Sequence, residues 1–372
     1  MTGAHPEGRP GPTGGPSGHG GAPTLAVVGA TGGVGAVLLE ILSQHADIWG
    51  EIRLVASPRS HGRKLVVRGV ETEVVALDEA AFEGVDVALF AVPERVAARW
   101  APVAVARGAL VVDSSGAFRA QPDVPLVVPE VNASAARLRP RGIIASPGCT
   151  TLSMIVAVGA LHAAFGLREL VVSSYEAVSG AGRAGVDALR AQLAVVAGGG
   201  RELGTHPGDV RRAVGDRMGP FQAPVALNVV PWAGEPADGG WSSRELAIRE
   251  ETRRILGLPE LPVSATCVRV PVVATHSVSV HARFKREVDV ERAHEVLANA
   301  PGVVLCDSPE EAEFPTPVDA VGTDPTWVGR VRRSLDDPCA LELFACGDNL
   351  RKGSALNAAQ IAELVAAGLT AR

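Results

Sequence analysis

A glycine-rich turn between an apolar strand and a helix constrains the fold of this chain more than any other stretch. Residues 24–28 read TLAVV, residues 29–35 read GATGGVG, and residues 37–42 follow a helical apolar pattern. Small residues let a backbone approach a pyrophosphate, and the N-terminus of the following helix favours an anion. In this context the turn predicts dinucleotide binding, the alternative being a purely structural turn. The predicted contact residues are Gly29, Thr31, Gly32, Gly33 and Val34.

Strand and helix patterns alternate after this turn. Strand-like runs at 52–56 and 109–113 enclose a helical pattern at 95–106. Such alternation is typical of a parallel sheet covered by helices. The predicted fold class is therefore α/β, with a Rossmann-type dinucleotide-binding domain over residues 24–147. The C-terminal helix, within residues 351–372, is expected to return to this domain.

The loop after the second strand bears on the choice between NAD and NADP. A site selective for NAD carries an acidic residue near the end of this strand, which holds the ribose hydroxyls. Residues 57–64 read SPRSHGRK instead, with hydroxyls and basic side chains and no acid. Ser57, Arg59 and Ser60 are therefore predicted to bind the 2′-phosphate of NADP. The alternative is a solvated basic loop.

Cys149 stands between a short apolar strand, residues 142–145, and an apolar helix. A thiol at a helix N-terminus meets the positive end of the helix dipole and unpaired backbone N–H groups, which stabilise a thiolate and can hold an oxyanion. The position predicts a nucleophile, although many cysteines are simply small apolar core residues. Arg119 lies past the end of the strand at 109–113, where it could pair with a phosphate.

The second half of the chain has a different pattern. Residues 263–270 and 277–283 alternate between apolar and polar side chains, as half-buried antiparallel strands do. Together with a strand at 169–175, they predict an α+β domain over residues 148–350 that is built on a mostly antiparallel sheet. Residues 198–240 are irregular and contain many glycines and prolines, which suggests a lid, a dimer arm or an insertion.

Composition excludes several classes of protein. The net charge of −6 leaves no basic stripe for nucleic acid, and no apolar run approaches the length that spans a membrane. The five cysteines are scattered without CxxC spacing, so we predict no metal site and no disulfide framework. Residues 1–23 are rich in glycine and proline and lack a signal or transit pattern, so a disordered tail and a cytoplasmic location are expected.

Taken in order, these motifs resemble those of the aspartate-β-semialdehyde dehydrogenases over nearly the whole chain after the tail. The matching strings are GATGGVG (29–35), ASPRSHGRKL (56–65), DSSGAFR (113–119), VPLVVPEVN (124–132), PGCTT (147–151), AVSGAGRAG (177–185), EETRRILG (250–257), CVRVPV (267–272) and DNLRKGSALNAAQIAEL (348–364). So many motifs in one order are far more specific than any single one. The resemblance implies a catalytic domain that also forms the interface of a homodimer, or of a dimer of dimers.

The resemblance also implies a chemistry. This family reduces β-aspartyl phosphate with NADPH to aspartate semialdehyde and inorganic phosphate, on the branch to lysine, threonine and methionine. Carried over by position, Cys149 is the nucleophile that forms a thioacyl enzyme and His276 is the acid/base, although a lone histidine at a strand end is more often structural. Arg269 would bind the substrate carboxylate and Arg119 the phosphate. Further cofactor contacts are implied at Ser179, Gly180 and Asn349.

The chain departs from the family pattern near this site. Glu176 replaces a glutamine, and Gly148 stands where an asparagine often precedes the nucleophile. The helix expected to start within residues 241–245 and to run to Leu256 offers Arg244 and Ala247 in place of E-x-x-K. Arg244 could replace the missing phosphate contact but would repel an ammonium group. Glu176 and Arg244 are therefore assigned to substrate binding, where one charge-assisted contact changes a preference by about 10- to 100-fold.

Three functions remain open on the sequence. The first is the NADP-dependent reduction of β-aspartyl phosphate, which the strings at 177–185 and 348–353 favour. The second is the same chemistry on a different acid, N-modified or without an amino group, which Glu176 and Arg244 favour. The string PGC at 147–149 also resembles the N-P-G-C of N-acetyl-glutamyl-phosphate reductases. The third is a catalytically silent nucleotide-binding paralogue, and the retained cysteine, arginine and histidine count against it.

Overall fold

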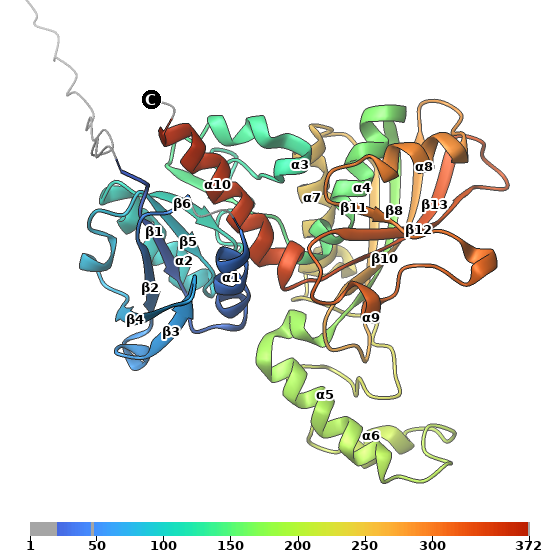
Figure 1. The fold of residues 1–372 in the computed structure, drawn as a ribbon. Coiled ribbons are helices and arrows are strands. Elements are labelled where there is room, and N and C mark those ends of the chain that lie inside the picture. The colour runs from blue at the N-terminus through green and yellow to red at the C-terminus, as the bar shows by residue number, and fades with distance from the viewer. Residues whose placement is uncertain (1–20, 46–47, 371–372) are drawn as a thin grey trace, which may run out of the picture.

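The computed structural model of the protein describes residues 21–45 and 48–370. Two sheet-bearing halves stand side by side, and helix α10 (Asn357–Thr370) lies between them (Figure 1). The tail that was expected to be disordered lies outside the described residues as far as residue 20. Pro23 is buried, and its carbonyl oxygen accepts a hydrogen bond from Gly50 N at 3.0 Å, so the chain joins the first half there.

A sheet of seven strands, among the residues described, forms the first half. Its strands are β1 (Leu25–Val28), β2 (Ile52–Ala56), β3 (Lys64–Val67), β4 (Val70–Ala76), β5 (Val87–Phe90), β6 (Leu110–Asp113) and β7 (Ile143–Ala145). They lie in the order β3-β4-β2-β1-β5-β6-β7, all parallel to their neighbours except the hairpin of β3 and β4. This is a Rossmann-type sheet, and the predicted α/β class is confirmed.

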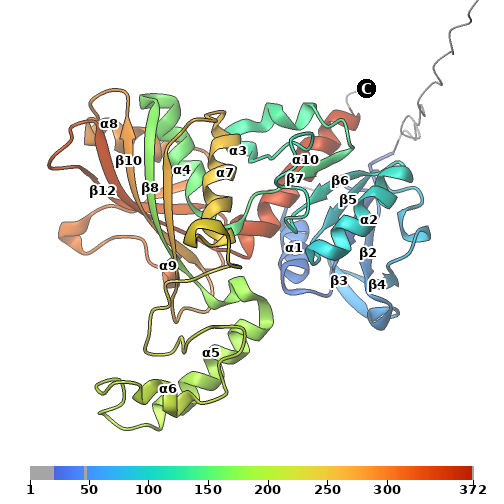
Figure 2. The same ribbon diagram turned by 180° about the vertical axis from the view of Figure 1, so that it is seen from behind.

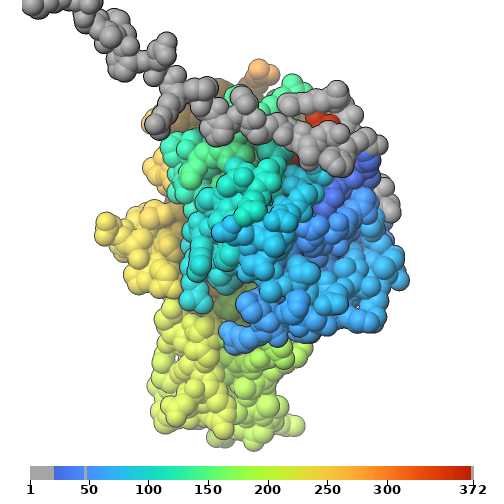
Figure 3. Space-filling model, turned by 90° about the vertical axis from the view of Figure 1, so that its left-hand side faces the viewer, coloured from blue at the N-terminus to red at the C-terminus, as the bar shows by residue number. Residues whose placement is uncertain are grey.

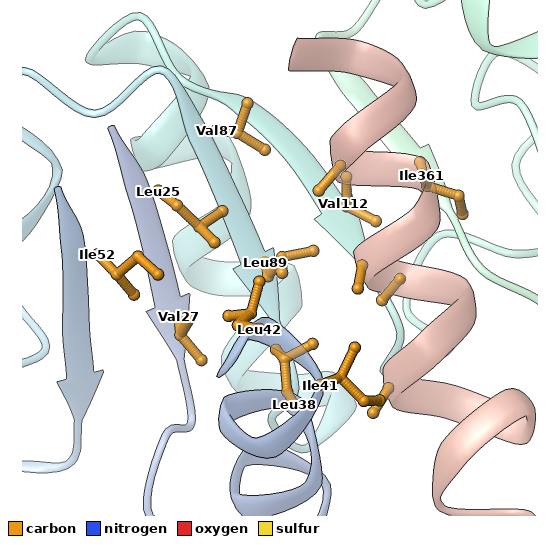
Figure 4. Close-up of a cluster of buried hydrophobic side chains, with 14 of the residues drawn as sticks. Leu25, Val27, Leu38, Ile41, Leu42, Ile52, Val87, Leu89, Val112 and Ile361 are labelled. Carbon is orange, nitrogen blue, oxygen red and sulfur yellow. The ribbon is translucent and has the colours of Figure 1, made fainter. Parts of the chain in front are cut away.

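Helices cover both faces of this sheet, which is why its strands are almost continuously apolar. Helix α1 (Gly33–Gln44) and α10 pack on one face, where Leu38 and Ile41 of α1 and Ile361 of α10 belong to one apolar core with side chains of β1 and β5 (Figure 4). Helix α2 (Glu94–Ala106) packs on the other face. The C-terminal helix therefore packs against the first half.

A second sheet, with six strands in the described chain, forms the other half. Its strands are β8 (Leu167–Glu176), β9 (Val263–Arg269), β10 (His276–Phe284), β11 (Val303–Leu305), β12 (Thr326–Arg333) and β13 (Ala340–Gly347), in the order β11-β12-β13-β10-β8-β9. Pairings are antiparallel around β10 and between β12 and β13, but β9 is parallel to β8, and β11 to β12. The prediction that residues 263–270 form an antiparallel strand was wrong. The alternation of apolar and polar residues indicates which face of a strand is buried, but not the direction of the strand. The long connection between β8 and β9 allows them to run parallel.

Helices α4 (Cys149–Phe165), α7 (Ser243–Leu256) and α8 (Val290–Ala298) cover one face of the second sheet. Helix α7 begins as predicted, with a capping box in which Ser242 and Glu245 each bond the other's backbone N–H. On the opposite face Val171 and Tyr175 are 40% and 37% exposed. The second sheet thus has one covered face and one that displays apolar side chains.

Between β8 and α7 the chain leaves the body of the molecule. Helices α5 (Gly182–Ala197) and α6 (Asp209–Val214) form an arm that extends away from both sheets, as Figures 2 and 3 show. The stretch at 198–240, predicted to be irregular, contains α6 and contributes to a small apolar core of its own. That core contains Val178, Ala188, Leu189, Phe221, Val225 and Ala226.

Short helices complete the fold. They are α3 (Pro129–Asn132), α9 (Pro317–Ala320), η1 (Pro58–Ser60), η2 (Ala80–Phe82), η3 (Ala133–Arg137), η4 (Val178–Ala181), η5 (Asp238–Gly240), η6 (Pro309–Glu311) and the π-helical η7 (Arg351–Leu356). Lys352 of η7 is buried and bonds both carboxylate oxygens of Glu130 at 2.7 Å, which ties η7 to α3. Among the helices described, none has the length and apolar character needed to cross a membrane.

Candidate active site

Cys149 is the first residue of α4 and follows a short link from the buried strand β7. Gly148 occupies the N-cap position without a side-chain hydrogen bond, and the first turn of α4 carries no acidic residue. The first turn of α4 therefore supplies no charge of its own that offsets the positive end of the helix, although Glu251 Oε2 of α7 accepts a hydrogen bond from Gly148 N there. Cys149 is only partly buried, so a substrate can reach it. This is the placement that the sequence predicted.

His276, the first residue of β10, faces this thiol. Its Nε2 atom lies 3.2 Å from Cys149 Sγ. Its Nδ1 atom accepts a hydrogen bond from Ala177 N at 3.1 Å. In the neutral form of the imidazole, the Nδ1 acceptor leaves the ring proton on Nε2, which faces the sulfur. The pair is thus oriented for proton exchange between the imidazole and the reacting group.

The surroundings favour the thiolate form of Cys149. Burial alone would raise the pKa of this thiol. His276 and Arg244 outweigh burial through their charges, His276 adds a hydrogen bond, and Glu176 opposes them. The resulting pKa is about 6, so the thiol is mostly deprotonated at neutral pH.

This pKa predicts how alkylation of the thiol depends on pH. The thiolate is the reactive form, so the rate of labelling of Cys149 by iodoacetamide should rise with pH through a midpoint of about 6. An ordinary cysteine has its midpoint at about 8.5. Mass spectrometry of the labelled peptide across a pH series measures this. A midpoint of about 8 or above would contradict the electrostatic arrangement described here.

Glu176 and Arg269 end the parallel strands β8 and β9, where they are register partners. Both side chains are buried, and Arg269 Nη2 lies 3.4 Å from Glu176 Oε2. Thr150, the residue after the nucleophile, donates to Glu176 Oε1 at 2.7 Å. Burial alone would raise the pKa of this carboxyl. The charges of His276, Arg244 and Arg269 and the Thr150 hydrogen bond outweigh burial and hold that pKa below its usual value.

Arg244 lies in the first turn of α7. Its Nε atom is buried and has no hydrogen-bond partner. Among the described residues, no carboxylate oxygen lies within 4.0 Å of its guanidinium group. The Cys149 thiolate is the largest cause of the raised pKa of Arg244, ahead of the opposing effect of burial and the charge of Glu176. The arginine is therefore an unpaired cation beside the nucleophile.

Glu251, two turns further along α7, holds the link that precedes the nucleophile. Its Oε2 atom accepts hydrogen bonds from Gly148 N at 2.9 Å and from the Thr151 hydroxyl. A Cβ atom at position 148 would lie 3.2 Å from Glu251 Oε2 and 3.4 Å from Arg119 Nη1. The space next to Gly148 is therefore already filled by these two side chains, which accounts for the glycine.

Arg119, predicted to bind phosphate, is largely engaged by the protein. Its Nε atom donates to Ser146 O at 2.7 Å and its Nη2 atom to Ser114 O at 2.8 Å. Its Nη1 atom is 3.8 Å from Glu251 Oε1. Only that nitrogen remains for an anion, and the phosphate contact stays a prediction.

The first group of predicted cofactor residues gathers at the start of α1. Thr31 Oγ1 lies 3.5 Å from Ser60 Oγ, so the glycine turn meets η1. Gly29 has a φ of 97°, and a Cβ atom there would lie 2.3 Å from Ala91 O, so only glycine fits. Gly32 caps α1 without a side-chain bond, and no acid lies in its first turn, which leaves backbone N–H groups for a pyrophosphate. Gly33 and Val34 begin α1, and Ser57 and Arg59 are exposed at η1.

A second group of predicted cofactor residues borders the catalytic pair. Asn349 Oδ1 accepts from Thr275 N at 2.8 Å, and Asn349 Nδ2 donates to the Ser179 hydroxyl at 2.9 Å. A Cβ atom at Gly180 would lie 3.3 Å from His276 Nε2. The structure therefore brings these residues to the nucleophile, and their contact with a cofactor stays a prediction.

Gly353 and Arg351, both in η7, support the site in ways that sequence reasoning missed. A Cβ atom at Gly353 would lie 3.1 Å from Cys149 Cβ, so the turn packs directly against the nucleophile. Arg351 Nη1 pairs with Glu40 Oε1 of α1 at 2.8 Å, which ties the proposed nucleotide helix to the same turn. The string DNLRKG at 348–353 marks this turn in the sequence, but the residues that the turn contacts, Cys149 and Glu40, are distant along the chain.

Thr150 and Glu251 were also missed as supporting residues. Both occur in quoted strings, PGCTT and EETRRILG, and a buried polar residue beside a nucleophile is a usable signal. Within the part of the chain that is described, no group of three or more His, Cys, Asp or Glu side chains is arranged to hold a metal ion. Each of the five cysteines is free.

Comparison with known families gives matches in both halves of the chain. The NAD binding domain of semialdehyde dehydrogenases matches residues 24–138, and the semialdehyde dehydrogenase dimerisation domain matches residues 158–352. The aspartate-semialdehyde dehydrogenase of Corynebacterium melassecola is 46% identical over 349 residues, which cover 92% of this chain and 99% of the relative. That of Aquifex aeolicus is 39% identical over 343 residues, 92% of this chain and 97% of the relative.

Solved structures agree with these matches. Aspartate semialdehyde dehydrogenase II of Vibrio cholerae, complexed with ASA, has a TM-score of 0.84 and 37% identity, covering 92% of this chain and 97% of the other. A probable aspartate-semialdehyde dehydrogenase of Pseudomonas aeruginosa has a TM-score of 0.81 and 31% identity, covering 92% and 98%. The similarity therefore extends over both halves of the fold.

Proposed function

The chain belongs to the aspartate-semialdehyde dehydrogenase family, and from this premise we propose that it reduces β-aspartyl phosphate to aspartate semialdehyde and inorganic phosphate, using NADPH. The contact of 3.2 Å between Cys149 Sγ and His276 Nε2, at the open end of α4, carries this proposal. It joins a nucleophile to an acid/base in one place. The function is a step of amino-acid biosynthesis.

The proposed chemistry balances with the groups present. The Cys149 thiolate attacks the acyl carbon, a sulfur–carbon bond forms, and the carbon–oxygen bond to phosphate breaks with its electron pair leaving on the phosphate. NADPH, when bound, supplies the hydride that reduces the thioester. His276 Nε2 gives a proton to the carbonyl oxygen after reduction and accepts it again as the aldehyde forms and the thiolate leaves. Backbone N–H groups of α4 stabilise the oxyanion in between.

An assay in the reverse direction tests the function. Phosphate- or arsenate-dependent reduction of NADP is measured with aspartate semialdehyde, beside the semialdehydes of N-acetylglutamate and succinate. The highest kcat/KM with aspartate semialdehyde is expected. A higher value with another aldehyde would favour a different acid, and no turnover with an unreactive Cys149 would favour a silent paralogue. The relatives found do not favour either alternative.

Cofactor preference is proposed to depend on η1. Arg59 is exposed beside Ser60, which meets the glycine turn, and is proposed to bind the 2′-phosphate of NADP. Arg59→Ala should lower kcat/KM for NADP by about 10- to 100-fold and change that for NAD by less than about 3-fold. Arg63→Ala, an exposed arginine of the same loop, is the control. Equal losses with both nucleotides would show that Arg59 does not select NADP.

We also propose a homodimer that works in the cytoplasm. The matched family model is a dimerisation domain, and one face of the second sheet displays the exposed side chains of Val171 and Tyr175. Five free cysteines, one of them reactive, suit a reducing compartment. Sedimentation of the purified protein would measure the oligomeric state.

A further inference from the structure

Three charged side chains around Cys149 each have a buried atom without a hydrogen-bond partner. These atoms are Glu176 Oε2, Arg244 Nε and Arg269 Nε. A buried polar atom without a partner is costly, so it commonly marks the place of a ligand. One acceptor and two donors are therefore left open at the nucleophile. Glu251 Oε1 is a further buried atom without a hydrogen-bond partner, and like Glu176 Oε2 it faces a guanidinium nitrogen, Arg119 Nη1 at 3.8 Å.

Two of these charges are adjacent. Glu176 Oε2 and Arg269 Nη2 are 3.4 Å apart, at the ends of neighbouring parallel strands. The remaining atoms of both groups are held in place, by Thr150 at Glu176 Oε1 and by Ala177 O at Arg269 Nη1. A fixed anion beside a fixed cation complements a ligand carrying an ammonium and a carboxylate on one carbon, as an α-amino acid does.

Arg244, in the first turn of α7, is a third charge whose field acts on both the sulfur and Glu176. No carboxylate oxygen of the described residues lies within 4.0 Å of its guanidinium group, and the Cys149 thiolate is the largest cause of its raised pKa. A single cation at the nucleophile complements an anion attached to the acyl carbon that the nucleophile attacks. In an acyl phosphate that anion is the phosphate.

We propose that Glu176 Oε2 accepts a hydrogen bond from the α-ammonium group of the substrate, while Arg244 binds the phosphate that Cys149 displaces. Arg269 then meets the α-carboxylate. This division rests on the proposed function, and it gives the ammonium group a carboxylate partner, Glu176, in a site where α7 offers an arginine. The glycine at 180 keeps the approach open, since a Cβ atom there would lie 3.0 Å from Arg269 Nη1.

The Glu176 half is tested by removing its charge. Glu176→Gln should lower kcat/KM for aspartate semialdehyde by about 10- to 100-fold and that for succinate semialdehyde, which has no amino group, by less than about 3-fold. Glu169→Gln, on the same strand, is the control and should leave the ratio unchanged. If Glu176 only orients Arg269, both aldehydes lose equally, because both carry a carboxylate. Equal loss would overturn this half of the proposal.

The Arg244 half is tested through phosphate. Arg244→Met should raise KM for inorganic phosphate in aldehyde oxidation by about 10- to 100-fold, with KM for the aldehyde changed by less than about 3-fold. Arg249→Met, which changes a half-buried arginine of the same helix that pairs with Glu250, is the control. An unchanged KM for phosphate would overturn this half.

A measurement without turnover separates these results from a failure of the proposed function. Inorganic phosphate should protect Cys149 from iodoacetamide in the wild type and not in Arg244→Met, at a pH where the thiol is ionised in both. Aspartate should protect better than succinate in the wild type, and equally well in Glu176→Gln. If aspartate semialdehyde is not a substrate but protection follows this pattern, the proposed reaction is wrong. The binding roles proposed for Glu176 and Arg244 are then still supported. If neither substitution changes the protection of Cys149, the binding roles proposed for Glu176 and Arg244 are wrong, even if the enzyme is active.

Discussion

Replacing Cys149 with alanine is expected to abolish NADP reduction with aspartate semialdehyde, with a loss in kcat of roughly 10⁴-fold or more. The sulfur is the protein atom that bonds to the acyl carbon in the proposed reaction, so no thioester forms without it. Its pKa of about 6 makes it a thiolate at neutral pH, and the open end of α4 stabilises the charge. Steady-state kinetics of the purified variant measure the loss.

Two controls belong with this substitution. Cys339→Ala removes a partly buried thiol at a residue whose hydrogen bonds are made by its backbone, and should keep kcat within about 2-fold. Circular dichroism and thermal unfolding of Cys149→Ala show whether the fold is retained. Appreciable turnover by a folded Cys149→Ala protein would disprove the covalent mechanism.

Replacing His276 with alanine is expected to lower kcat by about 10²- to 10⁴-fold, the range for the loss of a general acid/base. The imidazole holds the proton that faces the sulfur, because its Nδ1 atom is occupied by Ala177 N. The same substitution removes a charge and a hydrogen bond that lower the pKa of Cys149. The midpoint of alkylation should therefore move upward from about 6, and the thiol should become less reactive at neutral pH.

This double effect distinguishes His276 from a residue that merely supports the fold. A structural role would change stability, whereas the expected result combines a lower kcat with a shifted pH profile of alkylation. His294→Gln, which removes a histidine paired with Asp307 elsewhere in the second half, should change neither. An alkylation midpoint that stays near 6 in the His276 variant would mean that Arg244 alone sustains the thiolate.

The first half of the fold follows closely from local patterns in the sequence. Strand β1, the glycine turn and α1 were predicted because strand, turn and helix are contiguous and each has its own periodicity. The hairpin of β3 and β4 was missed, since its edge strand is short and largely exposed and resembles a polar loop. The three strands β11 to β13 were also missed, because no element was predicted between residue 283 and the C-terminal helix.

In the candidate site, too, some features follow from neighbouring residues and others depend on contacts between distant parts of the chain. Cys149 at the start of a helix and the capping box of Ser242 could be predicted, because the residues that define them are neighbours. The contacts of Thr150 with Glu176 and of Thr151 with Glu251 join positions separated by 26 and 100 residues, and no local pattern reports them. The sequence also predicted that Arg244 would repel an ammonium group of the substrate. Where that ammonium group binds depends on the position of Glu176, which no local pattern reports.

By itself the sequence determined the nucleotide-binding topology, the position of the thiol and the family, because these depend on contiguous motifs whose spacing sets the local backbone. Tertiary structure alone decided which charges face each other. The parallel pairing of β8 with β9 brings Glu176 beside Arg269, and the packing of α7 leaves Arg244 unpaired next to the sulfur. The physical reason is that Coulomb interactions and hydrogen bonds act over a few ångströms in space, whatever the separation along the chain.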